Sequence, residues 1–146
     1  MSNVAQVERI FSADENELSE LLAVYQSAGW WDTETEDYRQ ISTIISRSYC
    51  FAVIRIEEKI VGMARTISDG ISDAYIQDVA ILPEYQGLGY GKLLVDFLVE
   101  FLTDKQISWI GLIATPGAET FYRKSGFTAM ENFTPMLYKK EDRDVV

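Results

Sequence analysis

Hydrophobic and polar positions change their period along the chain, and each change predicts a new element of secondary structure. Val4–Phe11 alternates as an edge strand does, and Leu18–Tyr25 carries apolar residues at helical spacing. A capping box before this helix can use Ser12–Glu15 or Asp14 with Glu17. The chain is therefore expected to begin with a strand that leads into a helix.

A second helix and a hairpin are predicted next. Thr33–Glu36 opens the second helix, and Tyr38–Ile45 places apolar residues on one of its faces. Two β-rich runs follow, Cys50–Ile56 and Ile60–Ile67, and the short polar connection Glu57–Lys59 between them is typical of a hairpin.

The second half of the chain alternates strands and helices. Thr115 and Pro116 supply a cap and a first-turn proline for the last helix. The predicted elements are a strand at Ala74–Leu82, a helix at Gly89–Thr103, a strand at Ser108–Ala114, a helix from Thr115 to Gly126, and closing strands at Thr128–Met130 and Met136–Lys140. Residues 1–146 are therefore expected to form a single domain of the α/β (α+β) class, with one mixed sheet and helices on both faces.

The composition removes several classes of function. The chain has no histidine, which excludes Ser-His-Asp and Cys-His nucleophiles and most zinc sites, so we expect no metal. Proton transfer then falls to carboxylates, Tyr, Lys, Cys or water. The net charge of −10 argues against nucleic-acid binding. The eight acids and no bases between Asp14 and Asp37 form either a solvated helical face or a field that attracts a cationic substrate.

Cysteine content and hydropathy predict a cytoplasmic protein that does not enter a membrane. Cys50 is the single cysteine and cannot form an internal disulfide, so we expect it to be a buried structural thiol. No apolar run approaches the length of a membrane span, and Met1–Gln6 lacks the features of a secretory signal.

The turn at Gln86–Lys92 carries the clearest chemical signal. A strand leads into three glycines at alternate positions, and an amphipathic helix begins there. Glycines allow a ligand to approach the backbone, and the free N–H groups and dipole of a helix start favour a phosphate. The spacing matches neither a Walker loop, because Leu93 follows Lys92, nor the dinucleotide fingerprint Gly-x-Gly-x-x-Gly. A pyrophosphate site is therefore predicted, with a plain glycine-rich turn as the alternative.

Two motifs give the chain a family resemblance. Gln86-x-x-Gly89-x-Gly91 follows a Val-Ala-Ile-x-Pro strand, and Ala118-x-x-Phe121-Tyr122-x-x-x-Gly126-Phe127 follows the next strand. In this order and context they resemble the two signatures of the GCN5-related N-acetyltransferase superfamily, over nearly the whole chain. One departure is Thr115, which stands where family members often carry Asn.

The resemblance implies a mostly antiparallel sheet with a central pair of splayed strands, and a site for acetyl-CoA as co-substrate. The pantetheine arm would enter the splay, and backbone N–H groups of the glycine turn would hold the pyrophosphate. The implied cofactor-binding residues are Val79, Ala80, Ile81, Gln86, Gly87, Leu88, Gly89, Tyr90, Gly91, Lys92, Thr115 and Ala118.

The resemblance also implies how protons move during acetyl transfer. Tyr122 matches the tyrosine that many members use as a general acid toward the leaving thiolate. Asp78 is the predicted general base, and Glu34 and Glu36 are alternatives near the start of the second helix.

The implied activity is direct transfer of an acetyl group from acetyl-CoA to the primary amine of a small, cationic molecule. Trp30, Trp31, Glu34 and Tyr38 are the predicted acceptor-binding residues. A protein lysine or N-terminus is the alternative acceptor, and a non-catalytic coenzyme A-binding module is the alternative of another class. Many relatives pair, so a homodimer is expected by analogy.

Overall fold

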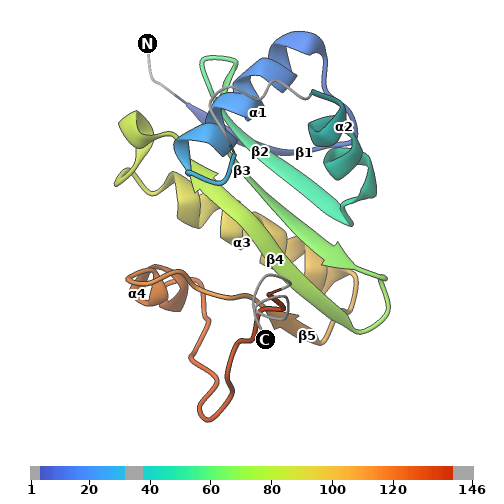
Figure 1. The fold of residues 1–146 in the computed structure, drawn as a ribbon, viewed down its shortest axis with the longest axis vertical. Coiled ribbons are helices and arrows are strands. Elements are labelled where there is room, and N and C mark those ends of the chain that lie inside the picture. Colours follow the sequence, from blue (N-terminus) through green and yellow to red (C-terminus); the bar gives the residue numbers. More distant parts are fainter. Residues whose placement is uncertain (1–3, 32–37, 140–146) are drawn as a thin grey trace. The chain divides into compact units, whose positions relative to one another are not determined.

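The computed structural model describes residues 4–31 and 38–139 (Figure 1). The chain divides into two compact units, Met1–Leu112 and Ile113–Val146, and each is described by itself. The prediction of a single domain over 1–146 stays a prediction. In the described part of the chain, no helix combines the length and the apolar character that spanning a bilayer requires.

The first unit is built on one mixed sheet. Its strands follow the chain in space as β1-β2-β3-β4-β5; the first four are antiparallel and β5 joins β4 in parallel. The strands are β1 (Ala5–Ile10), β2 (Cys50–Ile56), β3 (Lys59–Ser68), β4 (Asp73–Ile81) and β5 (Trp109–Gly111). The helices of this unit are α1 (Glu15–Ser27), α2 (Tyr38–Arg47) and α3 (Tyr90–Asp104), with a short 3-10 turn at Pro83–Tyr85.

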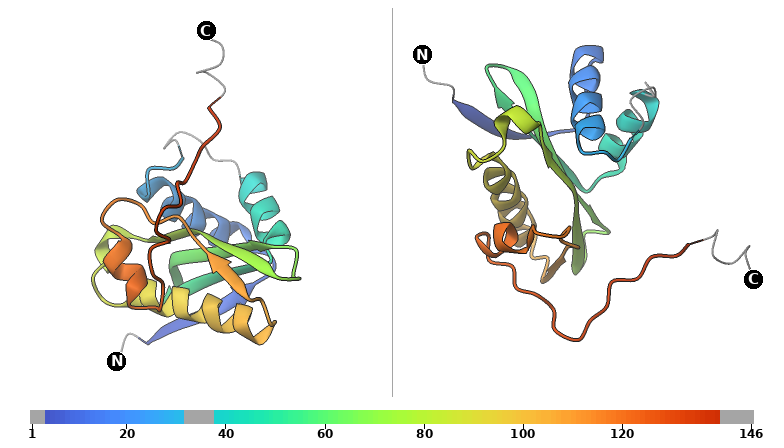
Figure 2. Two further views of the ribbon diagram at one scale, coloured as in Figure 1. Left: turned by 90° about the horizontal axis from the view of Figure 1, so that it is seen from below. Right: turned by 60° about the vertical axis from the view of Figure 1, so that its left-hand side comes forward.

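Helices cover both faces of this sheet, as predicted. Figure 2 shows α1 and α2 on one side of the strands and α3 on the other. Strand β2 is therefore buried along its length except at Arg55. The α3 face contributes Leu94, Leu98 and Leu102 to the core, all fully buried, and burial of apolar surface from two sides stabilises the sheet.

The hairpin between β2 and β3 is tighter than the sequence suggests. Lys59 belongs to β3, so the connection is only Glu57 and Glu58. Both have positive φ, 50° and 70°, as the central residues of a type I′ turn do. This turn matches the right-handed twist of the flanking strands.

The prediction for the end of the chain is wrong in two respects. Residues 128–139 form no strand, and the N-cap of α4 (Glu119–Arg123) is Ala118 rather than Thr115. Gly117 has a φ of 86°, which interrupts the helix that Thr115 and Pro116 would begin. The predicted closing strands rested on apolar content alone, but a strand also needs a hydrogen-bonded partner, and these side chains are mostly exposed (Met136 at 89%).

Helix α1 begins with a complete capping box at the second of the two predicted places. The Asp14 carboxylate accepts the backbone N–H of Glu17 at 2.8 Å, and the Glu17 carboxylate accepts the N–H of Asp14 at 2.9 Å. Two of the helix's free donors are thereby satisfied.

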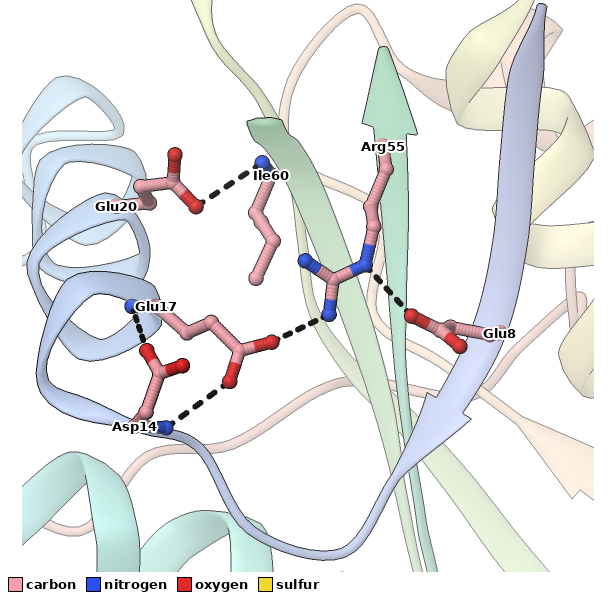
Figure 3. Close-up of polar contacts among 6 residues, drawn as sticks. All are labelled: Glu8, Asp14, Glu17, Glu20, Arg55 and Ile60. Atoms are coloured by element: carbon pink, nitrogen blue, oxygen red, sulfur yellow. Dashed lines mark hydrogen bonds and ion pairs between the residues drawn. The ribbon is translucent and has the colours of Figure 1, made fainter. Parts of the chain in front are cut away.

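The same Glu17 also joins the helix to the sheet. Arg55 of β2 donates to Glu17 at 2.5 Å and to Glu8 of β1 at 2.6 Å, so one guanidinium links three elements (Figure 3). Glu20 of α1 adds a contact with the backbone N–H of Ile60 at 3.3 Å. The acids of α1 thus fix its place on the sheet.

Glu17→Gln tests this link through its pH dependence. The N–H of Asp14 and the Arg55 guanidinium lower the pKa of Glu17 from its usual 4.5. Because the folded pKa is the lower one, the stabilisation is full above pH 4.5 and is lost as pH falls further. Urea unfolding should therefore show a loss of about 1.5 kcal/mol in Glu17→Gln at pH 7 that shrinks as the pH falls below 4.5 and through the lowered pKa of Glu17. Glu15→Gln, in the same helical turn, is the control; a loss in Glu17→Gln that does not change with pH would refute the link.

Candidate functional site

The turn between β4 and α3 has the backbone conformation that glycine favours. Gly87 and Gly89 have φ values of 78° and 87°, and Gly89 is the N-cap of α3 without any side-chain cap. Nothing lies within 4 Å of where a Cβ would stand at either glycine. The glycines therefore serve the conformation of the turn and leave open space above it.

Backbone donors at this turn are available to a ligand. Within the described residues, no backbone acceptor pairs with the N–H groups of residues 87–92, and the first helical bond runs from Leu93 N–H to the Gly89 carbonyl at 3.2 Å. Free N–H groups and the positive end of the helix dipole meet here. Such donors at a helix start favour an anion such as phosphate, and the pyrophosphate site stays a prediction.

Two of the predicted cofactor-binding side chains have partners within the protein. The Gln86 amide donates to the Ile81 carbonyl at 2.9 Å and braces the turn, while Lys92 pairs with Asp96 at 2.6 Å along α3. Leu88 is exposed and Tyr90 half-buried. Contacts from this turn to an anion would therefore come mainly from its backbone.

Strand β4 has a free outer edge next to the turn. It pairs with β5 only from Asp73 to Tyr75, whereas its pairing with β3 continues to Ile81. From Ile76 onward no described strand pairs with this edge, which is the splay that the resemblance implies. Val79, Ala80 and Ile81 lie half-buried on it. An extended polar chain can add to such an edge through backbone hydrogen bonds.

Gly62 allows strand β3 to lie close to the end of β4. A Cβ at Gly62 would meet the Ile81 side chain and would stand 2.9 Å from the Ala80 carbonyl oxygen. Any larger residue must therefore push the end of β4 outward.

Asp78 lies in a β-bulge, and the bulge decides where its carboxylate points. The register with β3 shifts between Met63 and Arg65, and Asp78 has a φ of 56°. Its Oδ2 accepts the Arg65 Nε at 2.6 Å and the Tyr25 hydroxyl at 2.9 Å. Arg65 also lies 3.5 Å from the Ser48 hydroxyl. The predicted base is thus a half-buried carboxylate held by two donors.

Tyr25 connects this carboxylate to the two predicted acceptor-binding tryptophans. Its ring stacks on Trp31 at 4.5 Å and meets Trp30 edge-on at 6.2 Å. Burial, and then the charge of Asp78, raises the pKa of the Tyr25 phenol far above its usual value. Trp30 remains 45% exposed. Aromatic surface and carboxylate therefore belong to one connected cluster.

Of the other residues predicted for the acceptor or as alternative bases, the structure describes only Tyr38. Tyr38 is the half-buried first residue of α2. Glu34 and Glu36 lie outside the described residues.

Sequence reasoning missed Tyr25 and Arg65. Tyr25 sits at helical spacing with Leu21 and Leu22 and was indistinguishable from a core aromatic. Arg65 did offer a signal, because a lone arginine between Ala64 and Thr66 in an apolar strand requires a partner nearby.

Tyr122 belongs to the second unit. It lies in α4, and its ring meets Phe121 at 4.9 Å and Phe127 at 6.1 Å. Burial raises the pKa of the Tyr122 phenol, so this group keeps its proton at neutral pH. Ala118 is the N-cap of α4, and the Thr115 carbonyl accepts the Ala118 N–H at 2.9 Å. The Thr115 hydroxyl is not the helix cap.

Comparison with known proteins gives a consistent result. Residues 12–127 match the sequence model of the Acetyltransferase (GNAT) family. The chain is 34% identical over 116 residues to an uncharacterized N-acetyltransferase ycf52-like protein of Prochlorococcus marinus, covering 77% of this chain and 63% of that protein. It is 42% identical over 67 residues to serotonin N-acetyltransferase 2, chloroplastic, of rice, covering 46% of this chain and 34% of that protein.

A solved structure shares the fold. A GNAT family acetyltransferase of Streptococcus pneumoniae superposes with a TM-score of 0.75 at 22% identity, covering 94% of this chain and 98% of that one. The matched part of the chain spans less than two thirds of the length of these two curated relatives.

Asp78→Asn tests whether the Arg65–Asp78 pair stabilises the fold. The two side chains are 17% and 23% exposed, and removing one charge leaves the other uncompensated. Because Asn tolerates positive φ as Asp does, the backbone should not add strain. We expect thermal or urea unfolding to show a loss of about 2–3 kcal/mol.

Asp96→Asn is the matched control, since the Lys92–Asp96 pair is 44% and 43% exposed and should contribute under about 0.5 kcal/mol. Equal losses in the two variants would contradict a structural role for the buried pair.

Proposed function

Because this chain belongs to the GNAT acetyltransferase family, we propose that it transfers the acetyl group of acetyl-CoA to the primary amine of a small, cationic molecule by direct transfer. The observation that carries the proposal is the β4–α3 connection. Its open strand edge at Val79–Ile81 leads directly into the free N–H groups of residues 87–92. The strand edge suits an extended pantetheine chain, and the turn suits a pyrophosphate.

Direct transfer needs few protein groups. A carbon–nitrogen bond forms, the carbon–sulfur bond of the thioester breaks, and one proton leaves the nitrogen while another reaches the sulfur. A backbone N–H near Val79 and Ala80 would polarise the thioester carbonyl. In the proposal Asp78 accepts the proton of the amine, and the protonated Tyr122 phenol donates to the sulfur.

The acceptor side supports a small amine that carries an aromatic group. Asp78 offers one carboxylate, and the Arg65 guanidinium 2.6 Å away already offsets its negative charge. An acceptor with several positive charges is therefore disfavoured here. Trp30 and Trp31 offer aromatic surface against the ring of Tyr25, whose hydroxyl donates to Asp78. Among cationic acceptors we therefore favour an arylalkylamine over a polyamine or an aminoglycoside, in line with the name of the rice relative.

Compartment and assembly are part of the proposal. Cys50 is a buried free thiol, which suits a reducing compartment such as the cytoplasm. The rice relative is named as a chloroplastic protein. We keep the homodimer and the metal-free reaction as expectations.

Amine-dependent release of coenzyme A tests the function. Purified protein is incubated with acetyl-CoA and tryptamine, 2-phenylethylamine, putrescine, spermidine, an aminoglycoside or a lysine peptide, and free thiol is followed. We expect the aromatic amines to give the highest kcat/KM. Tyr122→Phe should bind acetyl-CoA normally and lose about 100-fold in kcat.

Three other outcomes would refute specific parts of the proposal. Turnover of the peptide alone would indicate a protein acceptor, and highest turnover of the polyamines would overturn the preference for aromatic amines. Normal binding of acetyl-CoA without turnover of any amine would indicate a non-catalytic binding module.

Gly89→Ala tests the pyrophosphate site, and Gly29→Ala is its matched control. Both glycines have positive φ, 87° and 78°, with nothing within 4 Å of a new Cβ, so both variants should lose about 1–2 kcal/mol of stability through backbone strain. Only Gly89→Ala changes the donors at the start of α3. Calorimetry should show at least about tenfold weaker coenzyme A binding in Gly89→Ala than in Gly29→Ala. Equal affinities would place the pyrophosphate elsewhere.

A further inference from the structure

We propose that Tyr25 is a positioning residue for the amine acceptor. Its hydroxyl and the Arg65 guanidinium both bind Oδ2 of Asp78, which reserves Oδ1 of that carboxylate for the N–H of the amine. The inference rests on the proposed function, since it assigns a task to the base of that reaction.

The two donors converge on one oxygen atom. Tyr25 donates to Oδ2 at 2.9 Å and Arg65 Nε donates to the same atom at 2.6 Å. Within residues 4–31 and 38–139 no hydrogen bond reaches Oδ1, and 23% of the Asp78 side chain is exposed. A carboxylate has acceptor sites on both oxygens. Two donors on Oδ2 therefore fix the rotation of the group and leave the second oxygen for a substrate.

The phenol is built to act only as a donor. Tyr25 is 1% exposed, and burial together with the charge of Asp78 raises the pKa of its hydroxyl, so the proton stays on Tyr25 throughout the working pH range. The Trp31 ring stacks on the phenol at 16° from parallel, which favours this orientation of the Tyr25 ring. Tyr25 of helix α1 thus orients the carboxylate of Asp78 on β4.

This arrangement predicts a particular kind of defect when the hydroxyl is lost. Without Tyr25 O–H the carboxylate can rotate about its bond and offer either oxygen to Arg65. The amine would then meet a base that is misoriented for part of the time, whereas the β4 edge and the glycine turn would be unchanged. Small misplacements of a reacting group are costly in rate.

Tyr25→Phe tests the inference, because it removes the hydroxyl and keeps the ring and its stacking. We expect kcat/KM for the amine to fall about tenfold, with an unchanged KM for acetyl-CoA. Tyr49→Phe is the control. Tyr49 is half-buried and packs on Phe101, and in the described part of the chain its hydroxyl makes no hydrogen bond. It should retain wild-type kinetics.

A double-mutant cycle with Asp78→Asn separates positioning from stability. If Tyr25 acts through Asp78, adding Tyr25→Phe to Asp78→Asn should cost less than about threefold more. Arg65→Lys keeps the positive charge but replaces the guanidinium Nε–H that binds Oδ2 with an ammonium group of different geometry, and should repeat the effect and the non-additivity. It also decides the question should Tyr25→Phe fail to fold.

The possible failures are distinguishable. Full additivity, or wild-type kinetics in both Tyr25→Phe and Arg65→Lys, overturns the positioning role while the proposed function stands. Absence of amine turnover in the wild-type chain overturns the proposed function, and the positioning role with it.

Discussion

The ion pair between Arg65 and Asp78 is the constraint on which the site depends. Ala74 and Ile76 alternate onto a buried face of β4, and strict alternation would place Asp78 on that same face. An unpaired carboxylate there would be costly. The bulge, with Asp78 at a φ of 56°, turns the side chain to Arg65 and Tyr25 instead. The strand thereby supplies a half-buried carboxylate on the side of the sheet that α1 covers.

Three features of the candidate site belong to this one strand and its continuation. The bulge carries Asp78, the next residues form the free outer edge at Val79–Ile81, and the chain then reaches the glycine turn that begins α3. Gly62 keeps the neighbouring strand close at the same level. On the proposed function, this one segment of the chain carries the base, the strand edge for the pantetheine chain and the anion site.

Features encoded by neighbouring residues could be predicted from the sequence, whereas features that depend on contacts between distant residues could not. The capping box at Asp14 and Glu17, the hairpin and the glycine turn before α3 are each encoded within a few residues, and the structure confirms them. The Arg65–Asp78 pair depends on a register shift between two strands, which no local pattern reveals. The closing strands were wrong for the same reason, because apolar residues predict a strand only where a partner edge exists. The short α4 differs: Gly117 stands in the sequence, but only its φ of 86° shows that it interrupts the helix.

The contacts of the acidic residues change the interpretation of the chain's negative charge. Asp14 and Glu17 cap α1, and Glu17 and Glu20 also hold the helix to the sheet, so this part of the acidic run is structural rather than a field for substrates. At Asp78 the adjacent guanidinium offsets the negative charge. On the proposed function, the described part of the site therefore selects amines more by aromatic stacking on Trp30 and Trp31 than by the number of their positive charges. Tyr25 connects the aromatic surface to the carboxylate, because its ring stacks on Trp31 and its hydroxyl donates to Asp78.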